Sequence, residues 1–187
     1  MSQNDTPRNN GMLVPFIIAL IASLIAIAAF FLPYISMTDE YAKYLESRAN
    51  EKAFETVDLK VGDMKELSLF EYAKTYFQGG KEIMRNEDSG IFYGSFFTSP
   101  GVLSLLVLLG VIKKKPIMTF IFTALMAGIV YMLNWDFVDR GIMPSSNGIW
   151  GISYHLYYPC AAVIALCAIW IFVLKRKMKK EKKASAV

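Results

Sequence analysis

The sequence has few cysteines and only one histidine. Its two cysteines, Cys160 and Cys167, lie together in one uncharged run near the C-terminus. Seven helical residues separate two Cα atoms by about 10 Å along the helix axis, which is beyond the reach of a disulfide. We therefore expect both thiols to be free. The polar segments 35–90 and 136–152 contain no cysteine at all, so they must fold without a disulfide.

Common catalytic signatures are also missing. The sequence contains no Gly-rich phosphate-binding loop, no His-Glu-x-x-His or Gly-x-Ser-x-Gly motif, no Cys-x-x-Cys pair and no kinase element. These absences predict a non-enzymatic protein that uses no cofactor and no metal ion. The two polar segments also lack an Asn-x-Ser/Thr glycosylation sequon, which together with the missing disulfides favours a bacterial plasma membrane.

Charge is absent from four long stretches. Hydrophobic residues make up 55% of the 187 residues and charged residues 19%, and the uncharged runs cover 12–34, 91–112, 116–135 and 149–174. About 20 helical residues cross a hydrocarbon core of roughly 30 Å, so we predict four transmembrane helices. The first run is too long for a signal-peptide core and ends in the bulky "AFFLPYIS", which predicts a retained helix. Because no run contains an internal charge, an ion-coupled transporter is not expected.

Positive charge is concentrated at two places that predict the orientation of the chain. The tail segment 175–183 holds seven basic residues against one glutamate, whereas segment 36–90 holds eight basic and twelve acidic residues. Basic residues in short loops stay on the cytoplasmic side. The topology-determining residues are Lys113, Lys114, Lys115, Lys175, Arg176 and Lys177. Both termini are thus expected inside, and the net charge of +4 reflects two faces of opposite sign, with no implication of nucleic-acid binding.

The predicted fold class is an all-α membrane protein, a four-transmembrane-helix bundle with a small α+β extracytoplasmic cap between the first and second helices. The predicted order is a disordered cytoplasmic N-terminus (1–11), first span (12–34), cap (35–90), second span (91–112), cytoplasmic loop (113–115), third span (116–135), second outer loop (136–152), fourth span (153–174) and basic cytoplasmic tail (175–187).

The cap has the patterning of a small folded unit. Apolar residues recur at helical spacing from Tyr41 to Ala53, and Thr38 or Asp39 is suited to cap that helix. Alternation over 57–64, with a break at Gly62-Asp63, predicts a short hairpin. Ser68 and Glu71 form a capping box before a second helix, which Gly79-Gly80 is expected to end. Since about 55 residues bury little surface, we expect the cap to pack on the outer helix ends and on the second outer loop.

Small residues follow one stripe on three of the predicted spans. Such stripes let helix backbones approach closely in lipid, so we expect packing seams there. The residues are Ala19, Ala22, Ser23, Ala26 and Ala29 in the first span, Ala124, Ala127 and Gly128 in the third, and Ala161, Ala165 and Ala168 in the fourth.

Few polar side chains near the spans are candidates for a ligand or partner site. They are Asn134, Trp135, Asp136, Asp139, Arg140 and His155. Asp136 or Asp139 can pair with Arg140 to cap the third span, or the group can contact a substrate. His155 lies among aromatic residues, which indicates an interfacial belt, although the two aspartates could approach it as a site. The basic tail is either a simple anchor of the last span or a binding surface for anionic lipid.

The chain resembles a group of small bacterial four-span membrane proteins. The resemblance lies in "FFLPYIS" at the end of the first span, "KKKPIMTFIF" between the second and third, and "GIWGISYHLYYPCAAVIALCAIWIF" leading into the fourth. The helix arrangement and the large first outer loop are similar to those of claudin-like tetraspans. However, the tryptophan and paired-cysteine signature of that loop is absent, so no junctional role is implied.

Two hypotheses of function follow. The first is an accessory or scaffold protein in the lipid bilayer, whose cap binds another membrane protein or a second copy of the chain. The second is a handler of small molecules or lipids, with a cavity between the helices that opens at Asp136, Arg140 and His155.

Overall fold

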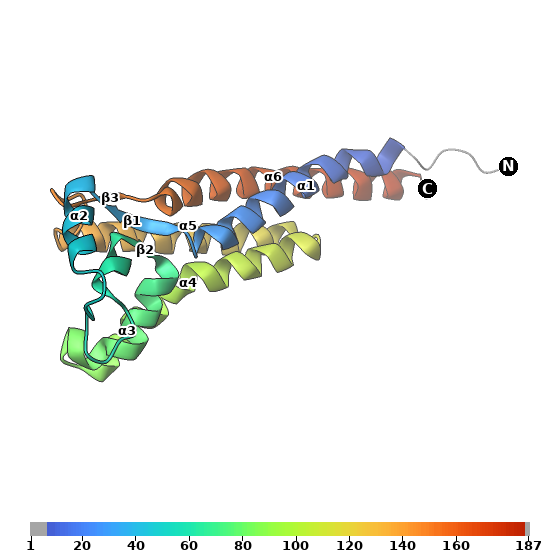
Figure 1. The fold of residues 1–187 in the computed structure, drawn as a ribbon. Coiled ribbons are helices and arrows are strands. Elements are labelled where there is room, and N and C mark those ends of the chain that lie inside the picture. Colours follow the sequence, from blue (N-terminus) through green and yellow to red (C-terminus); the bar gives the residue numbers. More distant parts are fainter. Residues whose placement is uncertain (1–6, 186–187) are drawn as a thin grey trace.

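The computed structural model describes residues 7–185, and this part of the chain is mostly helical (Figure 1). Its four longest helices are α1 (Pro7–Ala29), α4 (Glu87–Ile112), α5 (Pro116–Asp139) and α6 (Ile152–Ala184). Each packs against two of the others, in the ring α1–α4–α5–α6. All four are long and apolar enough to cross a membrane, as the sequence predicts. The predicted disordered segment covers residues 1–11. Its residues 1–6 lie outside the described residues, whereas residues 7–11 belong to helix α1.

Small residues line the inner face of α1 and part of the inner face of α6. The five residues of the α1 stripe are buried, and the Ser23 hydroxyl donates to the Ala19 carbonyl at 2.7 Å. Ala161 and Ala168 of α6 are buried too. The expected seam on α5 is wrong, because Ala124 and Gly128 are exposed. There the larger residues Met126, Val130, Leu133 and Phe137, three or four positions apart, face the core.

A three-stranded antiparallel sheet closes one end of the bundle. Strand β1 (Pro33–Met37) lies in the middle, between β2 (Glu66–Ser68) and β3 (Gly148–Trp150). The helix α1 therefore ends before the residue 34 expected from the sequence, because Pro33 begins an extended segment. Residues 35–37 of β1 belong to the predicted cap and pair with β3 of the second loop, so the predicted packing of these two segments is confirmed.

The cap contains two α-helices, α2 (Asp39–Ser47) and α3 (Leu69–Met84), and the 3₁₀ helix η1 (Val61–Lys65). The hairpin predicted over 57–64 is wrong, since η1 occupies its second half and only one bridge, Lys52 to Lys60, precedes it. The Asp63 carboxylate accepts a hydrogen bond from the backbone N–H of Lys60 at 3.2 Å, which closes a helical turn. Val57, Leu59 and Leu67 form a small core under this loop.

Helix α3 begins as predicted and continues farther than predicted. The Ser68 hydroxyl accepts from the Glu71 N–H at 3.1 Å, and the Glu71 carboxylate accepts from the Ser68 N–H at 2.7 Å. Gly79 and Gly80 do not end the helix, which runs to Met84 and stops at Arg85 in the left-handed conformation. The glycines serve packing instead. A Cβ atom on Gly79 would lie 2.4 Å from Val57 Cγ2, and one on Gly80 would lie 2.4 Å from Gly90 Cα of α4.

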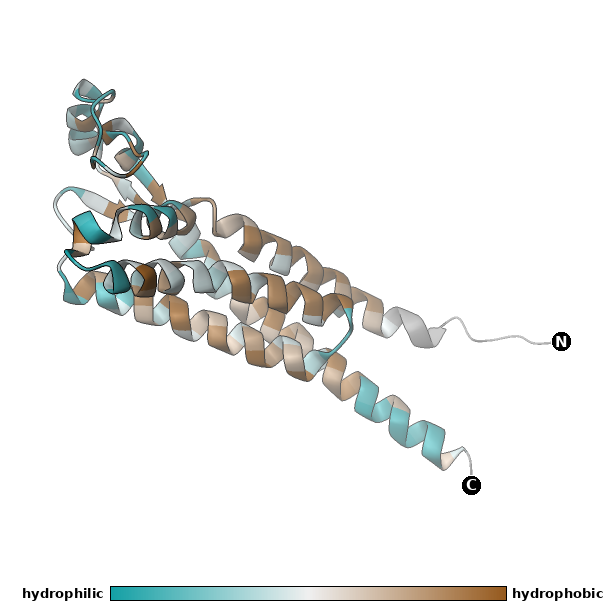
Figure 2. Cartoon of the chain, turned by 90° about the horizontal axis from the view of Figure 1, so that it is seen from below, coloured by the Kyte–Doolittle hydropathy of each residue, from teal (hydrophilic) through white to brown (hydrophobic). Residues whose placement is uncertain are grey.

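The other helices also extend beyond the predicted spans. Helix α4 starts at Glu87, with Asn86 as its N-cap, and α5 ends at Asp139. Helix α6 continues through the basic tail to Ala184, since lysine, arginine and glutamate favour helix. Figure 2 shows hydrophilic residues at both ends of the bundle, in the cap and along the last turns of α6, with hydrophobic residues between them.

Candidate functional site

The polar residues predicted near the third span lie at the capped end of the bundle. Asn134 connects three elements there. The Tyr34 hydroxyl of β1 donates to Asn134 Oδ1, and Asn134 Nδ2 donates to the Tyr158 hydroxyl of α6 at 2.5 Å. Tyr34 is fully buried, and its burial raises the pKa of its phenol, so the hydroxyl remains a donor. Asn134 thus uses its amide to join β1, α5 and α6.

Asp136 and Arg140 form an ion pair one helical turn apart, as one of the sequence alternatives expects. The guanidinium also lies over the rings of Tyr93 and Phe137, with its Cζ 5.5 Å and 5.9 Å from their centroids. Partial burial acts to lower the pKa of Arg140, but Tyr76 and the Asp136 carboxylate outweigh it and raise that pKa. The arginine is therefore a permanent cation that fastens the end of α5 to α4.

Trp135, Asp139 and His155 are exposed. The His155 ring meets the Tyr154 ring edge to face at 5.0 Å between centroids. Within residues 7–185, no hydrogen bond or ion pair joins His155 to Asp136 or Asp139. The six candidate residues consequently divide into three that bind elements of the fold together and three that face outward.

An aromatic cluster, which the sequence analysis missed, lies beneath the cap. Phe97 of α4 is fully buried and stacks with Tyr72 and Tyr76 of α3, at 5.2 Å and 5.3 Å between centroids. Phe137 of α5 lies 5.7 Å from Phe97. Burial raises the pKa of the Tyr72 phenol, as expected for a ring enclosed by others. The spacing Tyr72, Tyr76 was visible in the sequence, but its partners come from two distant helices.

An acidic groove of about 590 Å³ opens on the cap between α2, η1 and β2. Its charged lining residues are Asp39, Glu46, Asp63, Lys65, Glu66 and Glu71. Lys65 donates to Glu46 at 2.7 Å, and this hydrogen bond lowers the pKa of that carboxyl group. Glu71 and Asp63 are engaged at helix starts. With five carboxylates against Lys65 alone, the groove has an excess of negative charge, and Asp39 and Glu66 are its carboxylates with no hydrogen bond described above.

The cap loop between α2 and η1, residues 48–60, is held against α3 by Glu82. Its carboxylate accepts from the Glu55 N–H at 3.0 Å, the Thr56 N–H at 3.1 Å and the Thr56 hydroxyl at 2.7 Å. The Thr56 hydroxyl bond and the two backbone bonds lower the pKa of Glu82, so it stays ionised and keeps accepting at neutral pH. The loop is thereby an ordered part of the cap surface.

The six residues predicted to determine the topology lie at the opposite end of the bundle. Lys113, Lys114 and Lys115 form the turn between α4 and α5, and residues 175–177 lie on α6. The Lys175 ammonium donates to the Lys114 carbonyl oxygen, so the two basic segments meet.

Over the part of the chain that the structure describes, no three His, Cys, Asp or Glu side chains are grouped so that they could hold a metal ion. The fold and its surfaces define a class: a bundle of four helices able to span a membrane, closed at one end by a small folded cap. Comparisons of the chain with protein-family models, with curated proteins and with solved structures give no match.

Proposed function

We propose that this chain is a four-span protein of a bacterial plasma membrane whose outer cap binds a protein partner, and that both of its termini are cytoplasmic. The partner is another membrane protein or a second copy of the chain. The observation that carries the proposal is a folded cap whose surface has both exposed aromatic side chains and an acidic groove.

Apolar side chains on the outside of the bundle support a membrane location. Large exposed hydrophobic residues occur along all four long helices, among them Ile21, Leu105, Ile121 and Leu166. In water, so large an apolar surface would promote aggregation, whereas lipid tails cover it without cost. The polar ends in Figure 2 fit the headgroup regions on either side.

Cysteine labelling in intact cells tests the orientation. We expect an impermeant thiol reagent to label Lys60→Cys, in the cap, and to spare Lys113→Cys, in the turn at the other end, because basic turns stay in the cytoplasm. Both positions are exposed, and the native cysteines are buried, so the background is low. After the cells are opened, both variants should react. Labelling of residue 113 alone in intact cells would reverse the proposed orientation.

The cap has the properties of a binding surface. Sheet pairing, the Glu82 bonds and the α3–α4 contact fix its shape. Tyr44, Phe70 and Phe77 are nonetheless exposed by 50%, 45% and 51%. Exposed aromatic residues on a fixed scaffold are typical centres of protein interfaces. The excess carboxylates of the acidic groove favour a partner with a basic surface.

Photo-crosslinking from the cap tests partner binding. With benzoylphenylalanine at Tyr44 or Phe77, we expect a discrete protein adduct in native membranes, identified by mass spectrometry. The same residue at Leu166, which is 67% exposed on α6, is the control and should give lipid adducts. Asp39→Asn with Glu66→Gln should lower the cap adduct several-fold, because it removes two of the five carboxylates that line the acidic groove.

The absence of a protein adduct at both cap positions, under conditions where a known complex is captured, would contradict the proposal. The alternative function, a ligand cavity at Asp136, Arg140 and His155, has less support. Asp136 and Arg140 form an internal ion pair, and His155 is exposed with its ring against Tyr154. A different part of the bundle does offer a groove with the chemistry of a lipid site.

A further inference from the structure

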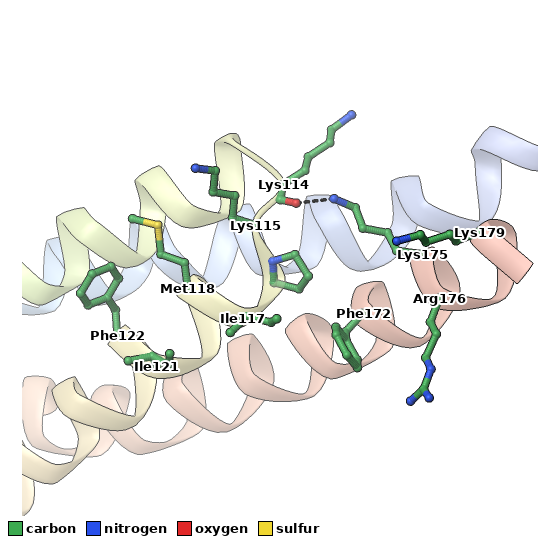
Figure 3. Close-up of a pocket in the computed structure, with 11 residues that line it drawn as sticks. Lys114, Lys115, Ile117, Met118, Ile121, Phe122, Phe172, Lys175, Arg176 and Lys179 are labelled. Atoms are coloured by element: carbon green, nitrogen blue, oxygen red, sulfur yellow. Dashed lines mark hydrogen bonds between the residues drawn. The ribbon is translucent and has the colours of Figure 1, made fainter.

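An apolar groove lies between the start of α5 and the second half of α6, at the end of the bundle away from the cap (Figure 3). Its volume is about 760 Å³, within the range of roughly 300–1,000 Å³ that is usual for ligand sites. The floor consists of Ile117, Met118, Ile121, Phe122 and Phe172. These side chains belong to the apolar parts of α5 and α6, so the floor is continuous with the outer surface of the bundle.

One end of the groove is surrounded by positive charge. The charged residues that line it are Lys114, Lys115, Lys175, Arg176 and Lys179, and no acidic residue is among the lining residues. Figure 3 shows the Lys115 and Arg176 side chains on opposite sides, with Lys175 and Lys179 along α6. We call this feature the basic groove. Its two parts, a cationic rim and an apolar floor, match an amphiphile with a negative head.

The fold brings these charges together by a tight turn. Lys114 adopts the left-handed conformation, with φ of 51°, so α5 starts directly after α4 ends. The Lys175 ammonium then donates to the Lys114 carbonyl, which fastens α6 to the turn. The Lys114 ammonium itself lies 5.4 Å from the Phe16 ring centroid, toward α1. The rim charges that remain for a ligand are therefore chiefly Lys115, Arg176 and Lys179.

The first turn of α5 adds to the attraction for an anion. Its N-cap residue is Lys115, whose side chain makes no capping bond, and Pro116 follows at the first helical position. The starts of α2 and α6 have no side-chain cap either, whereas α3 and α4 are capped by Ser68 and Asn86. An uncapped helix start carries partial positive charge on its free N–H groups and favours a phosphate.

We propose that the basic groove binds an anionic glycerophospholipid, with its phosphate among Lys115, Arg176 and Lys179 and one acyl chain along the floor. Arginine holds phosphate through two parallel hydrogen bonds, and lysine adds point charges. A soluble phosphate compound would leave the floor uncovered, whereas an acyl chain covers it. Basic pockets between spans on the cytoplasmic side are suited to acidic headgroups. This inference rests on the membrane location in the proposed function, and it is independent of the cap partner.

Native mass spectrometry of the full chain in detergent tests the site. In equimolar phosphatidylglycerol and phosphatidylcholine, we expect preferential retention of phosphatidylglycerol. Lys115→Gln with Arg176→Gln and Lys179→Gln should lower that preference by at least about tenfold, since each basic residue near an acidic lipid contributes a severalfold factor. The matched control, Lys180→Gln with Lys182→Gln and Lys183→Gln, removes the same number of charges from the part of α6 beyond the groove and should retain the preference.

The alternative outcomes are distinct. Equal retention of both lipids by the unmodified chain would overturn the proposal, and so would equal losses in the two triple variants, which would mean a general effect of net charge. Displacement of phosphatidylglycerol by an equal concentration of glycerol phosphate would assign the rim to a soluble anion and overturn the lipid assignment. None of these results depends on cysteine labelling or on cap crosslinking. Those two experiments would reveal a failure of the proposed function independently of the lipid test.

Discussion

Replacement of Gly80 by leucine is expected to release the cap from the bundle while α1, α4, α5 and α6 stay together. At this position α3 and α4 touch through their backbones, since a Cβ on Gly80 would lie 2.4 Å from the Cα of Gly90. A backbone cannot rotate away as a side chain can, so the two helices must separate. Overpacking typically lowers stability by about 1–3 kcal/mol. Because the contact is between backbones, we expect Gly80→Leu to lose stability at or above the upper end of this range.

Limited proteolysis gives the readout for Gly80→Leu. Trypsin should cut the variant in residues 43–65 of the cap, which are rich in lysine, much faster than the unmodified chain. Gly128→Leu is the matched control, because a Cβ on Gly128 would meet no atom within 4 Å apart from the local backbone of its own helix and its two chain neighbours. Cleavage rates that are the same in both variants would show that the close approach of α3 and α4 does not hold the cap in place.

Tyr34→Ala is expected to lower the free energy of unfolding by about 3–5 kcal/mol, the usual cost of removing a large buried aromatic ring. Tyr34 is fully buried, and its ring lies 6.0 Å from Phe137 and 5.9 Å from Trp150 between centroids. Its hydroxyl also satisfies the Asn134 amide. The substitution thus removes packing and a hydrogen bond at the junction of β1, α5 and α6.

Tyr34→Phe separates these two contributions. It keeps the ring and removes the hydroxyl, so we expect a smaller loss of about 1–3 kcal/mol from the unsatisfied Asn134 carbonyl. Thermal unfolding of the full chain in detergent, followed by tryptophan fluorescence, measures both variants. Adding Asn134→Leu to Tyr34→Phe should cost less than the sum of the single changes, because the two groups interact. If alanine and phenylalanine at position 34 were equally destabilising, ring packing would not be the main contribution of Tyr34 to the free energy of unfolding.

Features set by neighbouring residues were predictable from the sequence. The four apolar runs need only length and composition, and the Ser68–Glu71 capping box spans a single turn. Features set by distant residues were not. Gly79-Gly80 has the local appearance of a helix stop, but Val57 and Gly90 pack against these positions and the helix continues. The expected hairpin failed for a local reason, because the Asp63 side chain accepts from the Lys60 N–H three residues earlier and closes a 3₁₀ turn in its place.

The same distinction applies to the candidate sites. The Asp136–Arg140 pair was one of the expected alternatives, because residues four apart share a helix face. The role of Asn134 depends on Tyr34, which lies a hundred positions earlier. The two lysine-rich segments were predicted to lie on one side of the membrane, but their joining into one groove required the contact between Lys175 and Lys114. Sequence spacing could not show that α5 and α6 leave an apolar floor beneath them.

The central position of β1 in its sheet has a consequence for biosynthesis. One of its partners, β3, is encoded more than a hundred residues downstream. At about 5–20 residues per second, the ribosome makes β3 on the order of ten seconds after β1. During that interval one side of β1 is an open strand edge, which readily joins a wrong strand. A nascent chain that is cut short before β3 keeps this edge permanently, and the edge is then open to pairing with other chains.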